Sequence, residues 1–210
     1  MRKEKLGILC SGRGSNLASI IEAVERGDIP AKIAVVIADK ADAYALKRAR
    51  EKAIPAVPVI YRDYAERADF ERALLKELQA HGVTLVVLAG FMRILSPIFV
   101  HAYTGRILNI HPALLPSFPG AHAHRDALEY GVKVSGCTVH FVDEGMDSGP
   151  IIMQAAVPVL EGDTEETLAA RVLEQEHRIF PASIKLYVEG RLRTDGRKVH
   201  ILPAAEGGSL

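Results

Sequence analysis

Along most of the chain, short apolar runs alternate with segments in which apolar residues recur at helical spacing. This alternation is typical of βαβ units and predicts a largely parallel sheet. The run at residues 84–89 is apolar without alternation, which predicts a central strand covered on both faces. The predicted strands are residues 5–10, 32–38, 56–60, 84–89 and 106–110. The predicted helices are residues 16–24, 42–52, 64–81 and 91–103, the last interrupted at Pro97.

The pattern changes after residue 111. Three prolines and a glycine between residues 112 and 120 exclude a regular helix or a central strand, so we expect an irregular loop to about residue 121. Two segments then alternate between apolar and polar residues, at 134–142 and 151–159. They predict two strands that pair antiparallel around a turn at residues 143–150.

One long helix is predicted near the carboxyl terminus. Asp163 and Thr164 can cap it, and the helical pattern extends to about residue 190 with a predicted kink at Pro181. Residues 204–210 have the composition of a disordered tail.

Composition and charge are those of a soluble globular protein. The chain has 210 residues, of which 49% are apolar and 25% charged, so we expect a single domain over residues 1–210. Its 26 basic and 26 acidic side chains cancel, which argues against nucleic acid or an anionic bilayer as a partner. No apolar run predicts a signal peptide or a membrane span. Cys10 and Cys137 lie in strand-like sequence and are predicted to be buried, reduced thiols, which agrees with a cytoplasmic location.

A glycine-rich turn at residues 11–16 joins the first predicted strand to the first helix. Glycines let the backbone approach an anion, and the amide groups and dipole of a helix N-terminus favour negative charge. The last glycine of a dinucleotide-binding pattern and the lysine of a P-loop are both missing. The turn therefore favours a monophosphate site, and a plain tight turn capped by Asn16 is the alternative.

Asn109 and His111 stand where a predicted strand ends. They are two residues apart and share one face of an extended chain, at the end of the sheet where ligands bind in open α/β folds. A histidine there can act as acid or base near neutral pH, and an asparagine can donate to a developing oxyanion. A turn into Pro112 with a surface histidine explains the pair equally well.

Asp147 lies in the acidic turn at residues 143–150. Taken alone, such a turn is more often only solvated. A carboxylate that reaches His111 would orient the imidazole, raise its pKa and help to relay a proton. The candidate reaction centre is therefore Asn109, His111 and Asp147.

His122 and His124, together with His111 and His140, are weak evidence for a metal site. No Cys-x-x-Cys or His-Glu-x-x-His pattern is present, and we expect His140 to face away from the others. We therefore expect no bound metal.

Four segments share the order and spacing of one known family between about residues 5 and 193. They are Gly-Arg-Gly-Ser-Asn at residues 12–16, Ala-Gly-Phe-Met-Arg-Ile-Leu at residues 89–95, Asn-Ile-His-Pro-Ala-Leu-Leu-Pro at residues 109–116, and the segment from Gly-Cys-Thr-Val-His to Asp-Ser-Gly-Pro at residues 136–150. With these segments the chain resembles phosphoribosylglycinamide formyltransferase, the folate-dependent enzyme of de novo purine synthesis. It departs from the family at Ala113, where many members have serine, and at Arg13, where asparagine is also familiar.

The resemblance implies a fold and a reaction. The fold is a Rossmann-like, open, twisted and mostly parallel sheet with helices on both faces. The reaction transfers the formyl group of 10-formyltetrahydrofolate, a co-substrate, to the amine of 5-phosphoribosylglycinamide. The implied partners are these small molecules, without nucleic acid or membrane, and both a monomer and a homodimer stay open.

The resemblance also implies roles for individual residues. The matched catalytic residues are Asn109, His111 and Asp147. The matched substrate-binding residues are Gly14, Ser15 and Asn16 for the phosphate and Glu176 for the amine substrate. The matched folate-binding residues are Arg67, Leu88, Phe91, Met92, Arg93, Ile94, Leu95, Asn109 and Val142.

The expected mechanism is direct attack of the uncharged amine on the formyl carbon. Asn109 and protonated His111 would stabilise the tetrahedral oxyanion, and Asp147 would keep His111 charged and help the proton to reach the leaving folate nitrogen. Methionyl-tRNA formyltransferase and formyltetrahydrofolate hydrolase share this trio, but each needs an extra domain for which we expect no room. Two alternatives remain: a formyltetrahydrofolate hydrolase, which needs no phosphate site, and a non-catalytic module that binds a sugar phosphate.

Overall fold

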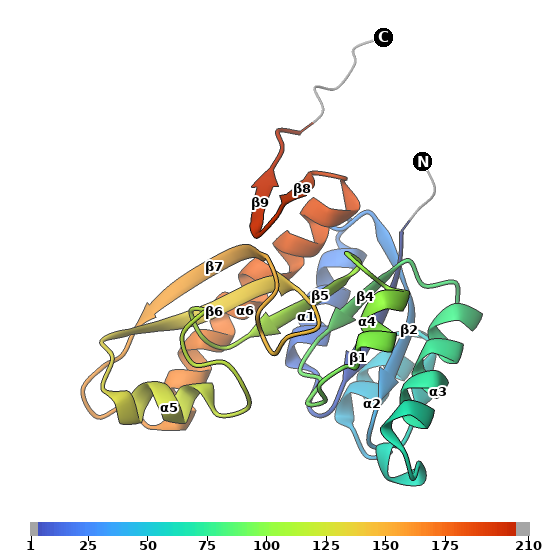
Figure 1. Cartoon of the computed structure of the whole chain (residues 1–210), viewed down its shortest axis with the longest axis horizontal. Helices are drawn as coiled ribbons and strands as arrows, with labels where there is room; N and C mark the ends of the chain where they lie inside the picture. Colours follow the sequence, from blue (N-terminus) through green and yellow to red (C-terminus); the bar gives the residue numbers. More distant parts are fainter. Residues whose placement is uncertain (1–3, 205–210) are drawn as a thin grey trace.

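The computed structural model describes residues 4–204, and within that range nine strands form a single sheet (Figure 1). Their order across the sheet is β3-β2-β1-β4-β5-β6-β7-β9-β8. The strands are β1 (Glu4–Cys10), β2 (Ala31–Ala38), β3 (Ala56–Pro58), β4 (Leu85–Leu88), β5 (Ile107–His111), β6 (Val134–Phe141), β7 (Ile151–Pro158), β8 (Leu192–Asp195) and β9 (Lys198–Ile201). The helices are α1 (Ser15–Glu25), α2 (Tyr44–Glu51), the 3-10 helix η1 (Tyr61–Asp63), α3 (Arg67–Ala80), α4 (Pro97–Ala102), α5 (Ala123–Tyr130) and α6 (Glu165–Val188).

The sheet is open and mostly parallel, as the sequence predicts. The neighbouring pairs among β1 to β5 are all parallel, whereas β6 is antiparallel to both β5 and β7. The predicted antiparallel pair around residues 143–150 is therefore confirmed. Successive strands β2 and β3 lie on one side of β1 and β4 lies on the other, so the strand order reverses between β1 and β4. The carboxyl ends of strands at such a reversal are where open α/β sheets bind ligands.

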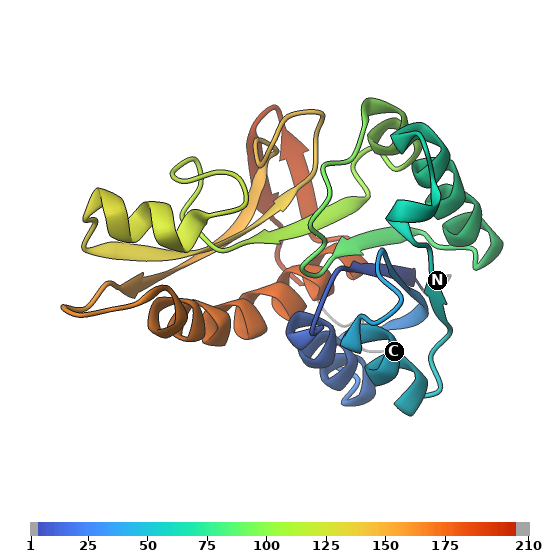
Figure 2. The same ribbon diagram turned by 90° about the horizontal axis from the view of Figure 1, so that it is seen from below.

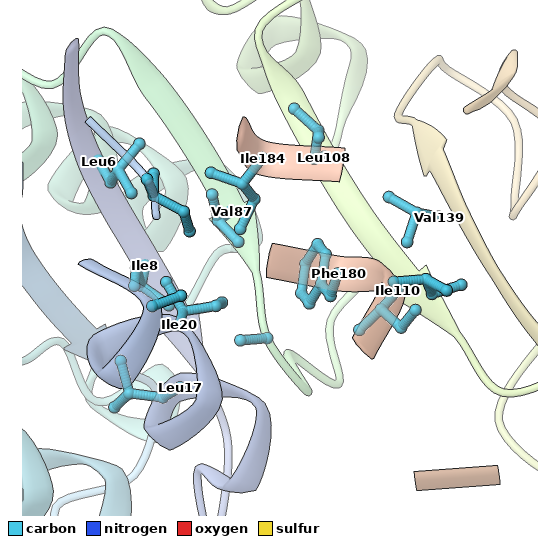
Figure 3. Close-up of a cluster of buried hydrophobic side chains, with 14 of the residues drawn as sticks. Leu6, Ile8, Leu17, Ile20, Val87, Leu108, Ile110, Val139, Phe180 and Ile184 are labelled. Carbon is cyan, nitrogen blue, oxygen red and sulfur yellow. The ribbon is translucent and has the colours of Figure 1, made fainter. Parts of the chain in front are cut away.

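Helices cover both faces of the sheet. Figure 2 shows α1, α2 and α6 on one face and α3 and α4 on the other, and a buried apolar cluster lies under each set. The cluster on the α1 and α6 side is drawn in Figure 3, where strand residues meet side chains of the two helices. The labelled residues are Leu6, Ile8, Val87, Leu108, Ile110 and Val139 from the strands, and Leu17, Ile20, Phe180 and Ile184 from the helices. This arrangement confirms the predicted fold class.

The helix predicted at residues 91–103 is wrong in its first half. Helix α4 begins only at Pro97, and Ser96 before it has an extended backbone with φ −76° and ψ 163°. Proline disfavours helical conformation in the residue before it and lacks the N–H that a preceding turn of helix would use. Residues 90–96 form an irregular loop instead. In this loop the backbone N–H groups of Met92 and Ser96 donate to the side chains of Ser11 and Glu71.

Three features were absent from the sequence-based prediction. They are the 3-10 helix η1, helix α5, which follows the proline-rich loop, and the hairpin of β8 and β9 at the edge of the sheet. The two residues between these strands are Gly196 and Arg197, and a glycine at the first position of a two-residue turn is a signal that could have revealed the hairpin. Gly196 has φ 55°, as such a turn requires. The predicted disordered tail lies, except for Ala204, outside the described residues.

Helix α6 begins where the sequence predicts. The side chain of Thr164 accepts from the Thr167 N–H at 3.3 Å, and the Thr167 hydroxyl accepts from the Thr164 N–H, which forms a capping box. The helix continues through Pro181 to Val188 without a break. Neither this helix nor any other within residues 4–204 is long and apolar enough to cross a membrane.

Candidate active site

A cavity of about 320 Å³ lies beyond the carboxyl ends of β4 and β5. Its size falls within the ~300–1,000 Å³ of typical small-molecule sites, and its wall is mostly apolar with a few convergent polar groups. Of the residues predicted to bind folate, those that line this cavity are Leu88, Phe91, Met92, Arg93, Ile94, Leu95, Asn109 and Val142. Arg67 does not line it. His111 and Asp147 also belong to the wall.

The structure brings together the three side chains of the predicted reaction centre. Asn109 and His111 come from β5, and Asp147 comes from the turn between β6 and β7. Nδ1 of His111 lies 3.4 Å from Oδ2 of Asp147, and Nδ2 of Asn109 lies 3.5 Å from Oδ1 of the same carboxylate. Antiparallel pairing places the end of β6 beside the beginning of β5, with Phe141 opposite Leu108. The turn after β6 therefore folds back along β5 for Asp147 to reach Asn109 and His111.

Asp147 has an unusual backbone that the turn holds in place. Its φ of 49° is in the left-handed region, where a residue other than glycine is strained by about 1–3 kcal/mol. Gly149 lets the backbone after Asp147 pass close to the end of β6, since a Cβ at that position would lie 1.8 Å from the carbonyl oxygen of Phe141. The Ser148 hydroxyl donates to Asp143 at 2.6 Å. Strained residues of this kind concentrate at functional sites, where the surroundings over-determine them.

The carboxylate of Asp147 is held in its charged form. Burial raises its pKa, but the contact with His140, the N–H of Gly120 at 2.8 Å from Oδ2, and the charge of His111 together bring the pKa below its ordinary value. Asp147 is therefore an anion at neutral pH and faces two imidazole rings.

Opposing effects act on His111, whose ring is almost entirely buried. Burial lowers its pKa most, Asp147 and the Phe118 carbonyl raise it, and His140 lowers it further, so that the pKa lies below its ordinary value. Nε2 is 2.8 Å from the Phe118 carbonyl oxygen, which only accepts, so Nε2 carries a proton. A second proton would therefore be placed on Nδ1, directly facing Asp147.

His140 faces the site, and the prediction that it points away is wrong. Its side chain is 2% exposed, its Nδ1 donates to the Phe141 carbonyl at 2.8 Å, and its Nε2 lies 3.1 Å from Nδ2 of Asn109. Nε2 of His140 also lies 3.7 Å from Oδ1 of Asp147, so this ring contacts both the amide of Asn109 and the carboxylate. Asn109 and His140 are directly paired across β5 and β6, a register that the sequence pattern did not determine.

The predicted phosphate turn lies at the N-terminus of α1. Gly14 has φ 69° just before the first helical residue, and a Cβ there would lie 2.8 Å from Cβ of Ala45. Nδ2 of Asn16 donates to Oε2 of Glu176 at 2.7 Å, so the two predicted substrate-binding sites meet between α1 and α6. Burial raises the pKa of Glu176, and the bond from Asn16 opposes that shift. The Ser11 N–H donates to the Gly90 carbonyl at 3.0 Å, which connects this turn to the cavity wall.

Two predicted folate residues carry their own ion pairs. Nε of Arg93 lies 2.7 Å from Oδ2 of Asp39, and its guanidinium lies 4.0 Å from the centre of the Tyr61 ring. Nε of Arg67 lies 2.9 Å from Oε1 of Glu71, away from the cavity lining. Asp39 and Glu71 are both buried, and sequence reasoning did not select either of them.

Cys10 and Cys137 are free and buried, as predicted, and burial raises the pKa of both thiols to about 12. His122 is the N-cap of α5 and His124 lies in its first turn. Among residues 4–204, no group of three or more histidine, cysteine, aspartate or glutamate side chains is arranged to hold a metal ion.

The chain is similar in sequence and structure to known enzymes. The model of the formyl transferase family matches residues 4–184. Phosphoribosylglycinamide formyltransferase of Escherichia coli (strain K12) is 48% identical over 186 residues, which are 89% of this chain and 88% of that protein. Glycinamide ribonucleotide transformylase 1 from Symbiobacterium toebii superposes with a TM-score of 0.94 at 54% identity, covering 96% of this chain and 95% of that one.

A hydrolytic relative shares the fold at lower identity. Formyltetrahydrofolate deformylase from Pseudomonas syringae pv. tomato superposes with a TM-score of 0.89 at 27% identity, covering 96% of this chain but 67% of that one. The fold alone therefore does not separate transferase from hydrolase, whereas identity over nearly full length does. The chain belongs to the formyl transferase family, within its phosphoribosylglycinamide formyltransferases.

Proposed function

We propose that the protein transfers the formyl group of 10-formyltetrahydrofolate to the amine of 5-phosphoribosylglycinamide, giving formylglycinamide ribonucleotide and tetrahydrofolate. The observation that carries this proposal is the meeting of Asn109, His111 and Asp147 at one wall of an apolar cavity that adjoins the glycine turn. The cavity suits a flat heterocyclic donor, and the turn suits a phosphorylated acceptor.

The reaction we propose is a direct transfer. The lone pair of the substrate amine attacks the formyl carbon, and the carbonyl oxygen becomes an oxyanion. The C–N bond to the folate nitrogen then breaks, and the proton lost by the amine is delivered to that nitrogen. Asn109 donates to the oxyanion from Nδ2, which lies 3.1 Å from Nε2 of His140.

His111 and Asp147 act as a proton-holding pair. In the free protein the pKa of His111 is lowered by burial, so the neutral ring is favoured before substrate binds. A developing oxyanion next to the ring stabilises the imidazolium and raises the pKa of His111. The carboxylate of Asp147 then accepts a hydrogen bond from the protonated Nδ1 of His111. His111 takes up the proton that the attacking amine loses and passes it to the leaving folate nitrogen, so the ring is neutral again at the end of the cycle. No covalent bond to the protein forms.

Substrate binding divides between two regions. Gly14, Ser15 and Asn16 bind the phosphate with main-chain amide groups at the start of α1, and the Ser15 hydroxyl donates a further hydrogen bond to it. Glu176 holds the amine substrate from α6, and its bond to Asn16 fixes the position of the carboxyl group. The folate heterocycle lies along the wall formed by residues 91–95, with Arg67 acting from outside the cavity lining.

The decisive experiment measures formyl transfer from 10-formyltetrahydrofolate by absorbance, with and without glycinamide ribonucleotide. We expect turnover only when the amine substrate is present. Release of formate without it would favour a hydrolase, and phosphate-ligand binding without turnover would favour a non-catalytic module. The proposal further places the reaction in the cytoplasm with small molecules as its partners, and sedimentation will decide between monomer and homodimer.

A further inference from the structure

The loop of residues 90–96, here named the wall loop, forms much of the apolar side of the cavity without belonging to a helix or strand. Its side chains alternate in exposure. Phe91 and Leu95 point into the protein and are 9% and 6% exposed, whereas Met92 and Ile94 are 71% and 61% exposed. Met92 and Ile94 therefore contribute little burial that would hold the loop in shape.

One anchor of the wall loop is Asp39 at the end of β2. Its side chain is fully buried and its Oδ2 lies 2.7 Å from Nε of Arg93. The guanidinium also lies over the ring of Tyr61, at 4.0 Å from its centre. A buried carboxylate that loses its cation is costly, so this pair fixes the middle of the loop against β2.

The second anchor is Glu71 on α3, which holds the end of the wall loop. Its side chain is 3% exposed, and its Oε1 accepts the backbone N–H of Ser96 at 2.8 Å. The Ser96 hydroxyl bonds to the other carboxylate oxygen, and Arg67 pairs with the same group from one helical turn before. Charge-assisted bonds to a backbone amide are among the stronger ones in proteins.

A third contact holds the beginning of the wall loop. The Met92 N–H donates to the Ser11 hydroxyl at 2.9 Å, and the Ser11 N–H donates to the Gly90 carbonyl at 3.0 Å. The loop is thus tied at its start, middle and end to three different elements, while neither Asp39 nor Glu71 lines the cavity.

We infer that Glu71 and Asp39 are positioning residues for the formyl donor: they hold the wall loop in the shape that binds it. The inference rests on the proposed function. The reaction centre lies on β5 and the turn after β6, so loss of an anchor affects donor binding more than the chemical step. Arg67 supports the same anchor through its ion pair with Glu71.

The test compares Glu71→Ala with Asp69→Ala, a matched change on the same helix at a carboxylate whose side chain is 50% exposed. For Glu71→Ala we expect the KM for the formyl donor, and the Kd for tetrahydrofolate by calorimetry, to rise about tenfold. We expect kcat and the KM for the amine substrate to stay within about twofold. Glu71→Gln keeps an acceptor for Ser96 and should restore most of the affinity. Asp39→Asn tests the second anchor in the same way.

Hydrogen exchange of the free protein supplies a readout that needs no activity. Peptides that cover residues 90–96 should exchange faster in Glu71→Ala, and in Asp39→Asn if the Glu71→Ala variant does not fold, but not in Asp69→Ala. Unchanged exchange, or faster exchange with an unchanged Kd for tetrahydrofolate, would overturn the inference. The wild type could show no turnover but still bind tetrahydrofolate, with that binding weakened in Glu71→Ala. That combination would refute the proposed function alone.

Discussion

Nδ1 of His111 lies 3.4 Å from the carboxylate of Asp147, on the opposite side of the ring from the Nε2 that donates to the Phe118 carbonyl. This tautomer leaves Nδ1 as the only site for a second proton, and that proton would face an anion. The relationship joins a strand residue, an acidic turn and the proline-rich loop in one hydrogen-bonded unit.

Asn109→Ala is expected to lower kcat by about a hundred- to a thousandfold, because it removes an oxyanion donor. The thermal unfolding midpoint should change little, since Asn109 is only partly buried. Steady-state kinetics and calorimetry on the same preparation measure the two effects. Near-normal turnover in this variant would remove Asn109 from the reaction centre.

Stability is expected to fall as the pH decreases from neutrality. The pKa of His111 in the folded state is below its ordinary value of 6.5, so the unfolded chain binds a proton first. The contribution is fully present above pH 6.5 and is lost as the pH falls through the folded pKa. Urea unfolding over a pH series measures the slope.

His111→Gln should reduce this dependence of stability on pH. Part of the dependence should remain, because burial also lowers the pKa of His124 and His177. His101→Gln is the control, because it removes a ring whose side chain is 65% exposed. Equal slopes in wild type and His111→Gln would contradict the assignment.

Ser15→Ala should raise the KM for the phosphorylated substrate about tenfold to a hundredfold, as loss of a hydrogen bond to a charged group would. The KM for the formyl donor and kcat should stay near their normal values. Ser19→Ala, one turn further along α1, is the control, since its hydroxyl bonds only to the Asn16 carbonyl. An unchanged KM in Ser15→Ala would argue against the phosphate site.

Gly149→Ala is expected to destabilise the fold by about 3 kcal/mol and to reduce turnover, because its Cβ would collide with the Phe141 carbonyl oxygen and displace Asp147. Gly12→Ala is the matched control, since a Cβ there meets nothing within 4 Å. Thermal unfolding of both variants checks the contrast. Similar midpoints would show that the turn tolerates a side chain.

The loop of residues 112–121 is expected to exchange more slowly when a folate ligand is bound. Phe118 and Gly120 already bond to His111 and Asp147, so a ligand in the cavity would stabilise the same arrangement. Hydrogen exchange with and without tetrahydrofolate measures this, with the β8–β9 hairpin as the internal control. Equal protection in both states would show that the loop does not close over the donor.

Much of the fold could be predicted because it depends on periodicity within short segments. Strands β1, β2, β4 and β5 are apolar runs, and the antiparallel pair of β6 and β7 follows from two alternating segments around a glycine-containing turn. The helical prediction over residues 91–96 was wrong because apolar spacing competes there with Pro97 and with side chains from other elements. Ser11 and Glu71 supply the bonds that a helix would otherwise make, and both are remote in sequence.

The sequence by itself determined the types of residue at the site and, through motif resemblance, their expected roles. Tertiary structure decided which groups meet: the pairing of Asn109 with His140, the positive φ of Asp147, and the burial of Asp39 and Glu71 behind the wall loop. The physical reason is that periodicity records only which face of an element is buried. The register between strands and the partners of buried charges depend on contacts between segments many residues apart, which no local pattern encodes.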